Sequence, residues 1–117
     1  MDNLKKINII KENREFDRII QNNTPFCYKS FLVYVEKKQK NYKFGISVSK
    51  KICNAVGRNK FKRQIRNILD KYEFNKDFNC IIIARKSILN YSFQELNDQL
   101  SYCLKKINII RGEKHEK

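Results

Sequence analysis

A run of nineteen residues in the middle of the chain, from 48 to 66, holds seven Lys or Arg side chains and no acidic one. On a helical wheel of about 100° per residue, the apolar side chains in and after this run share one arc: Phe61, Ile65, Ile68, Leu69 and Tyr72. The polar side chains occupy the neighbouring arc: Arg58, Asn59, Lys62, Arg63 and Arg66. The pattern predicts an amphipathic helix from residue 54 or 55 to about residue 72, with a core-facing stripe and a cationic face suited to polyphosphate.

The formal net charge of the chain is +14, which requires a polyanionic partner or a compositional explanation. Lys, Ile and Asn are all abundant, as expected from A/T-biased codons, so part of the lysine content carries no functional information. The same bias disfavours arginine, yet three of the seven arginines lie between residues 58 and 66. Residues 37–66 hold eleven cations and no acid, whereas a solvated surface usually mixes both signs. We therefore favour nucleic-acid binding over a solvated charge run.

The length of 117 residues fits one domain, 1–117, without room for a second core of ordinary size. Apolar runs are too short for a membrane-spanning helix, and the N-terminus lacks the apolar region of a secretory signal. We expect a cytoplasmic protein with no membrane partner and no small-molecule substrate.

Local signals outline the first half of the fold. A helix is predicted over residues 13–21, with Asn13 as its N-cap and Asn23 in the left-handed conformation at its end. Strands are predicted over residues 31–36 and 42–49. A polar hairpin loop is expected between these two strands.

The second half is outlined in the same way. Residues 79–85 are predicted to form a buried strand, because apolar residues lie on both faces of the segment. Ser92 and Glu95 form a capping box that starts a last helix reaching about residue 107. The expected order is αβββαβα, an α+β sandwich of one mixed sheet packed with helices, with a frayed tail after about residue 110. This order places three strands before the basic helix. Local signals give bounds for two of them, residues 31–36 and 42–49.

The chain carries no constellation of catalytic or metal-binding residues. Its only histidine, His115, lies in the tail, its acids show no converging spacing, and three glycines form no phosphate loop. The four cysteines lack the paired spacing of zinc ligands, and Cys80 and Cys103 lie in apolar patterns typical of buried thiols. We predict no catalytic residue, no metal site and no cofactor held by the chain itself.

Two aromatic residues have two open interpretations. Phe16 on the first helix and Tyr34 on the first delimited strand could stack on unpaired bases, or both could be core residues. For Tyr34 stacking is favoured, because Val33 and Val35 already supply the opposite face of the strand.

A set of motifs in fixed order covers nearly the whole chain. The central motifs are Ser49-Lys50-Lys51, Asn54-Ala55-Val56, Arg58-Asn59, Lys62-Arg63 and Arg66. The flanking segments are Arg14-Glu15-Phe16-Asp17, Phe31-Leu32-Val33-Tyr34, Phe44-Gly45-Ile46-Ser47-Val48-Ser49, Ile82-Ile83-Ala84-Arg85 and Ser92-Phe93-Gln94-Glu95-Leu96. Together they resemble the family of the protein subunit of bacterial ribonuclease P.

This resemblance implies a cofactor of a ribozyme that removes the 5′ leader of precursor tRNA. The implied partners are the ribonuclease P RNA subunit, which is the catalyst and requires Mg²⁺, and the precursor tRNA. Contact with the RNA subunit is implied for Lys50, Lys51, Arg58, Asn59, Lys62, Arg63 and Arg66. A groove for the single-stranded leader is implied for Phe16, Tyr34, Arg58 and Lys62. The resemblance also implies a left-handed crossover from the strand ending at Ser49 to the strand at Cys80, an exception to the usual hand.

The chain departs from the family at Ile20, where many members carry a second groove aromatic, and at Asn23, which replaces a turn glycine. Two rival functions stay open. A structural ribosomal RNA-binding protein would also be small, basic and α+β. A DNA-binding module could use Asn59 to read adenine, but the neighbouring cations favour backbone binding.

Overall fold

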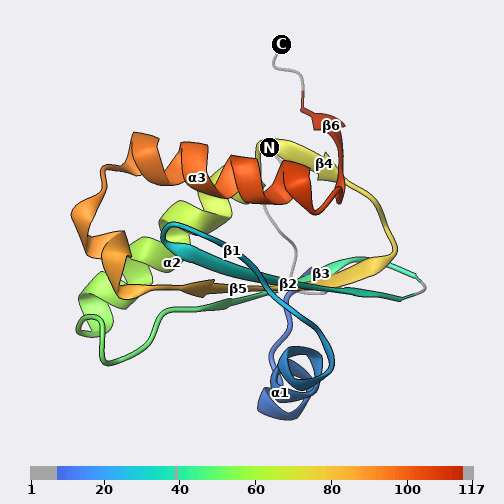
Figure 1. Cartoon of the computed structure of the whole chain (residues 1–117), viewed down its shortest axis with the longest axis horizontal. Helices are drawn as coiled ribbons and strands as arrows, with labels where there is room; N and C mark the ends of the chain where they lie inside the picture. Colours follow the sequence, from blue (N-terminus) through green and yellow to red (C-terminus); the bar gives the residue numbers. More distant parts are fainter. Residues whose placement is uncertain (1–7, 39, 115–117) are drawn as a thin grey trace.

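The computed structural model describes residues 8–38 and 40–114 (Figure 1). Its elements are α1 (Asn13–Asn22), β1 (Phe26–Tyr28), β2 (Phe31–Lys37), β3 (Lys43–Ser47), α2 (Ala55–Leu69), β4 (Tyr72–Phe74), β5 (Phe78–Ala84), the 3-10 helix η2 (Lys86–Asn90), α3 (Phe93–Lys106) and β6 (Ile110–Glu113). The main sheet and its helices follow the predicted αβββαβα order, so the expected α+β class is confirmed. None of the described helices is long and apolar enough to cross a membrane.

Strand β5 lies inside the main sheet, whose order is β1-β2-β5-β3. It pairs antiparallel with β2 and parallel with β3, so the sheet is mixed as predicted. The expected hairpin between β2 and β3 is wrong, because β5 separates these two strands. The uniformly apolar β5 buries both of its faces in this central position, which a β2–β3 hairpin would have denied it. Helix α2 forms the crossover between the parallel strands β3 and β5, while the left hand of that crossover stays a prediction.

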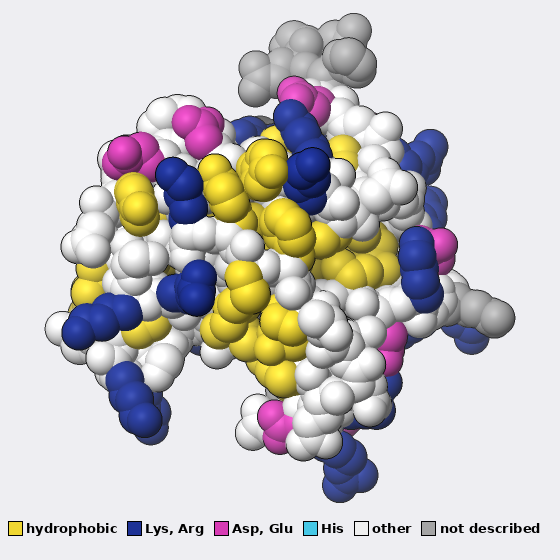
Figure 2. Space-filling view, in the orientation of Figure 1, with side chains coloured by type: hydrophobic (Ala, Val, Ile, Leu, Met, Phe, Trp, Pro, Cys, Tyr) yellow, Lys and Arg dark blue, Asp and Glu magenta, His cyan; other side chains and the backbone are white. Residues whose placement is uncertain are grey.

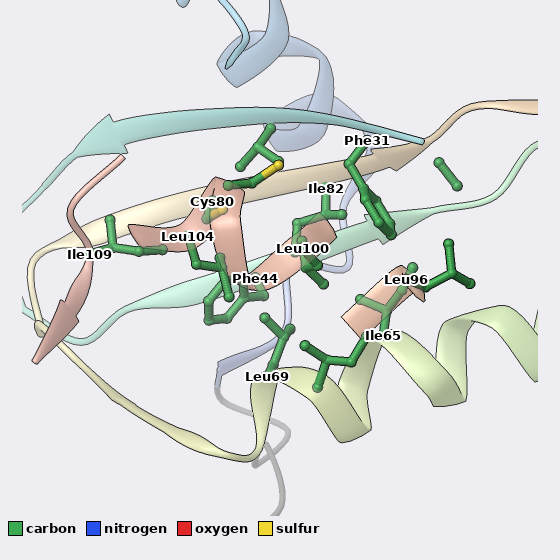
Figure 3. Close-up of a cluster of buried hydrophobic side chains, with 14 of the residues drawn as sticks. Phe31, Phe44, Ile65, Leu69, Cys80, Ile82, Leu96, Leu100, Leu104 and Ile109 are labelled. Carbon is green, nitrogen blue, oxygen red and sulfur yellow. The ribbon is translucent and has the colours of Figure 1, made fainter. Parts of the chain in front are cut away.

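Helices cover both faces of the sheet (Figure 1): α2 and α3 lie on one side and α1 on the other. The larger core lies between the sheet and the α2–α3 layer (Figure 3). Its labelled members are Phe31, Phe44, Ile65, Leu69, Cys80, Ile82, Leu96, Leu100, Leu104 and Ile109. A smaller cluster of Ile10, Ile19 and Ile81 lies under α1. Alternate residues of β5 therefore enter different cores.

An aromatic group fixes the edge strand β1 against α3. The ring of Tyr102 on α3 lies 4.4 Å from that of Tyr28 and 6.3 Å from that of Phe26, measured between centroids. Figure 2 shows hydrophobic side chains gathered over β1 and α3 on this face, with Lys and Arg side chains around them. Tyr102 remains 42% exposed, so the contact closes the end of the core without being buried.

The basic helix ends earlier than the pattern predicts. Helix α2 stops at Leu69, and Tyr72 belongs to β4, which pairs antiparallel with β6. The predicted fraying after about residue 110 is wrong for residues 110–113, because they form β6. Tyr72 and Phe74 are buried by this small sheet, and the preceding Ile109 is 1% exposed, so apolar burial holds the segment in place. His115 lies outside the described residues.

The cap predicted for α3 is confirmed, whereas those predicted for α1 are not. The predicted capping box of α3 is confirmed: Glu95 N donates to Ser92 Oγ at 3.2 Å, and Ser92 N donates to Glu95 Oε1 at 2.9 Å. Asn13 is not the N-cap of α1, since it is already helical and Glu12 occupies the cap position without a side-chain bond. Asn23 is extended, with φ −137°, and its Nδ2 donates to Ile19 O, which ends the helix without a left-handed residue.

The capping box gives a direct stability test. Ser92→Ala removes the acceptor for Glu95 N and is expected to lower the free energy of unfolding by about 1 kcal/mol. Ser92→Gly is the matched variant and is expected to cost only a few tenths of that loss, because glycine adopts the cap backbone readily. Urea denaturation of both variants measures the losses, and a Ser92→Ala variant as stable as the wild type would contradict the role of the hydroxyl.

Candidate RNA-binding site

The loop before α2 is built to start the helix in one position. The side chain of Asn54 accepts a hydrogen bond from Gly57 N at 2.9 Å, which caps the first turn. Ser49 closes the preceding turn, with its Oγ accepting from Lys51 N at 3.1 Å and its carbonyl from Ile52 N at 3.0 Å. A Cβ on Gly57 would lie 3.0 Å from Cys53 Sγ, so the loop packs tightly on the helix.

The faces of α2 follow the predicted wheel. Phe61, Ile65, Ile68 and Leu69 are buried in the main core. The predicted RNA-contacting residues of the helix and its loop point outward: Lys50, Lys51, Asn59, Arg63 and Arg66 are exposed, and Arg58 and Lys62 are half-buried. Within the described part of the chain no carboxylate lies within ion-pair distance of any of these cations. The cationic face is therefore available to an external anion.

Part of the charge of this face lies at the positive end of the helix, although Arg66 lies in its last turn. Helix α2 has no acidic residue in its first turn, where the unpaired backbone N–H groups already attract anions. Lys50 and Lys51 precede that turn, and Arg58 lies just after it. Arg58 Nη1 donates to Cys53 O at 3.2 Å, which orients the guanidinium toward the loop. Cations at this end are unfavourable for the isolated helix, so the arrangement favours a bound polyanion.

The two predicted aromatics lie together on the opposite side of the sheet. Phe16 and Tyr34 both pack, half-buried, against the small cluster under α1, where Ile20 joins them. Each ring therefore packs in a core and is also partly exposed. A role in the core does not exclude stacking on unpaired bases. No hydrogen bond or ring contact of the described residues joins either aromatic to Arg58 or Lys62.

Gly45 supports Phe16 and was missed as a site residue. A Cβ on Gly45 would lie 2.7 Å from Phe16 Cε2 and 2.8 Å from Ile81 Cδ1, so only glycine lets the ring rest on β3. An isolated glycine in an alternating strand is the signal that could have indicated such a close approach.

A second contact missed by sequence reasoning attaches α1 to the sheet. Arg18 forms a bidentate pair with Glu36 on β2, with Nη1–Oε2 at 2.5 Å and Nη2–Oε1 at 3.1 Å. Asn79 on β5 is 1% exposed and donates from Nδ2 to Glu36 Oε1 at 2.9 Å. The hydrogen bond from Arg18 is the main cause that holds the pKa of Glu36 below its usual range. We call these three residues the α1 clamp.

The cysteines have the roles of ordinary thiols. All four are free, and Cys80 and Cys103 are buried as predicted. Burial raises the pKa of Cys103 to about 12 and raises that of Cys80 as well, so both remain neutral. Among residues 8–38 and 40–114, no three His, Cys, Asp or Glu side chains are grouped so as to hold a metal ion.

The chain is similar to known proteins over most of its length. The profile of the family described as Ribonuclease P matches residues 4–108. The ribonuclease P protein component of Bacillus mycoides (strain KBAB4) is 38% identical over 117 residues, covering 95% of this chain and 100% of that protein. That of Streptococcus agalactiae serotype III (strain NEM316) is 36% identical over 109 residues, covering 92% and 100%. A solved structure of the Staphylococcus aureus RNase P protein aligns with a TM-score of 0.79 at 30% identity, covering 89% of this chain and 98% of that one.

Fold and site define a small α+β protein whose central helix presents an unpaired cationic face. The chain belongs to the ribonuclease P protein family, as its motifs indicated.

Gly45→Ala tests the support of Phe16. The new methyl group has to displace the ring or Ile81, so we expect the free energy of unfolding to fall by about 1–3 kcal/mol. Gly112→Ala is the matched control, because a Cβ there meets no atom within 4 Å. Urea denaturation of the two variants measures the contrast, and an unchanged Gly45→Ala would refute the close approach.

The α1 clamp predicts a pH-dependent loss. Arg18→Ala is expected to lower the free energy of unfolding only modestly at neutral pH, since the pair is partly exposed and screened by solvent. Because the folded pKa of Glu36 is depressed, this contribution is fully present above the unfolded pKa of the carboxyl and is lost as pH falls through the folded one. Arg14→Ala, on the exposed side of the same helix, is the control. A pH series of denaturation curves in which the Arg18→Ala deficit persists in acid would contradict the assignment.

Proposed function

We propose that this chain is the non-catalytic protein component of a ribonuclease P ribonucleoprotein. It binds the RNA subunit and the single-stranded 5′ leader of precursor tRNA, and so promotes endonucleolytic removal of the leader. The observation that carries the proposal is the cationic face of α2, which is free of acids and unpaired within the described residues. The family of the chain supports it.

In this proposal the RNA subunit catalyses the reaction and the protein helps to hold the substrate on it. The RNA subunit would hold the Mg²⁺ ions and catalyse the hydrolysis of the phosphodiester bond. The protein neutralises phosphates where two polyanions, ribozyme and substrate, must approach each other. Arg contributes paired hydrogen bonds to phosphate and Lys contributes compact positive charge. The residues proposed to contact the RNA subunit are Lys50, Lys51, Arg58, Asn59, Lys62, Arg63 and Arg66.

The leader is proposed to bind on the α1 side of the sheet. Phe16 and Tyr34 offer partly exposed rings to unpaired bases, each stack being worth about 1–3 kcal/mol. Arg58 and Lys62 are proposed to reach the same strand of RNA through its phosphates. Ile20, in the same cluster, offers burial but no ring face, so stacking here is limited to two aromatics.

Reconstitution tests the proposed function. A precursor tRNA with a 5′ extension is incubated with a bacterial ribonuclease P RNA at low Mg²⁺, with and without this protein. We expect correct 5′ maturation only when both components are present. A folded protein that binds RNA but gives no stimulation would overturn the proposal and favour a structural ribosomal role.

Arg58→Ala tests the cationic face. Loss of one charge-assisted contact to phosphate is expected to weaken RNA binding by about tenfold and to reduce the slope of log K against log salt by about one. The fold should persist, because Arg58 makes a single peripheral hydrogen bond, to Cys53 O, among the described residues. Arg111→Ala, exposed on β6, is the control. Wild-type cleavage by Arg58→Ala at physiological salt would count against the role.

A further inference from the structure

Four of the eleven cations in residues 37–66 precede α2 and its loop: Lys37, Lys38, Lys40 and Lys43. Lys37 lies 4.0 Å from Asp77, so it has a partner. The other three line an open hollow of about 630 Å³ together with Lys11. We call this site the basic hollow. None of its lysines belongs to the cationic face of α2.

The charge of the basic hollow is positive and uncompensated. Its four lysines face two acids, Glu12 and Glu15, at the start of α1. Glu15 Oε2 lies 3.9 Å from Arg18 Nη2, so its charge is already shared. Within the described ranges, no carboxylate is within ion-pair distance of any of the four ammonium groups. Glu36 is close enough to Lys38 for the two charges to attract, but its carboxylate accepts hydrogen bonds from Arg18 and Asn79 and does not line the hollow. With four lysines against two acids in its lining, the hollow keeps a net positive charge.

The hollow lies on the same face of the sheet as the proposed leader groove. Lys43 and Gly45 are two residues apart on β3, so their side-chain positions share one face, and Phe16 rests on Gly45. From Lys43 the strand runs about 13 Å to Ser47, shortly before the loop to α2 begins. Phe16 therefore separates the hollow from the cationic helix, and the two basic surfaces are distinct.

We infer that the basic hollow binds phosphate groups of RNA, as a contact separate from α2. The inference rests on the proposed function, because its ligand is RNA of the same complex. Ammonium groups act on phosphate as compact charges without reading bases, so the contact is independent of sequence. An open hollow with four unpaired lysines suits a backbone that passes through it. The phosphates belong either to the leader beyond the nucleotide at Phe16 or to the RNA subunit.

A triple variant tests the hollow. Lys38→Gln, Lys40→Gln and Lys43→Gln together remove three charges from it. The matched control removes three exposed charges elsewhere, at the end of α3 and on β6: Lys105→Gln, Lys106→Gln and Arg111→Gln. Binding is titrated over a range of salt against three RNAs: the RNA subunit alone, and its complex with a precursor tRNA carrying a leader of about 2 or about 16 nucleotides.

For the triple variant we expect binding to weaken by on the order of tenfold, either with the long-leader complex alone or in all three arms, with the salt slope reduced by about two, while the control stays near wild type. Loss confined to the long leader assigns the phosphates to the leader, and loss with the RNA subunit alone assigns them to that subunit. If the melting temperature of the triple variant is lower than that of the control, the single variant Lys40→Gln is used instead. For it we expect the slope of log K against log salt to fall by about 0.7.

Binding equal to the control in all three arms, with wild-type protein still stimulating cleavage, would overturn the inference and leave the proposed function standing. Failure of the wild-type protein to stimulate cleavage would instead overturn the proposed function.

Discussion

Burial of both faces of β5 is the constraint on which the rest of the structure depends. Cys80 and Ile82 point into the core shared with α2 and α3, while Ile81 points into the cluster under α1. One strand therefore sets the positions of the cationic helix and of the aromatic pair on opposite sides of the sheet. If one face of β5 were solvated, either α2 or α1 would have no core to pack on. The two proposed RNA contacts are thus positioned relative to each other, while α1 is docked, by a strand that lies between them.

Stability and binding make opposite demands on α2. Its cations repel one another and the positive end of the helix dipole, and no acid of the helix relieves them. The buried stripe of Phe61, Ile65, Ile68 and Leu69 holds the helix in place regardless. Because an external polyanion would relieve this repulsion, the proposed binding of RNA would also stabilise the folded chain.

Local features of this fold could be predicted from the sequence, and contacts between distant segments could not. The capping box at Ser92, the buried strand β5 and the two faces of α2 depend on neighbouring residues and short periods. The place of β5 between β2 and β3 depends on pairing across the chain, as does the β4–β6 sheet, whose strands are too short to show a period. The α1 clamp joins three elements through single side chains, which no local pattern marks. The roles of the RNA-contacting residues come from the family resemblance and stay predictions.

Helix α1 packs on a smaller cluster than α2 and α3 do. Ile19 is its one buried residue, Phe16 and Ile20 are partly buried, and its ion pair with Glu36 is partly exposed, whereas α2 and α3 share the main core. Such an element opens by local unfolding at a lower free energy than the sheet, so its amides exchange with solvent before those of β5. Phe16 leaves its place on Gly45 whenever the helix opens. A leader bound at the proposed groove would meet a population of docked and undocked helices, and its apparent affinity would be the intrinsic affinity multiplied by the docked fraction. The proposed recognition of the substrate would in this way be coupled to the folding of ten residues.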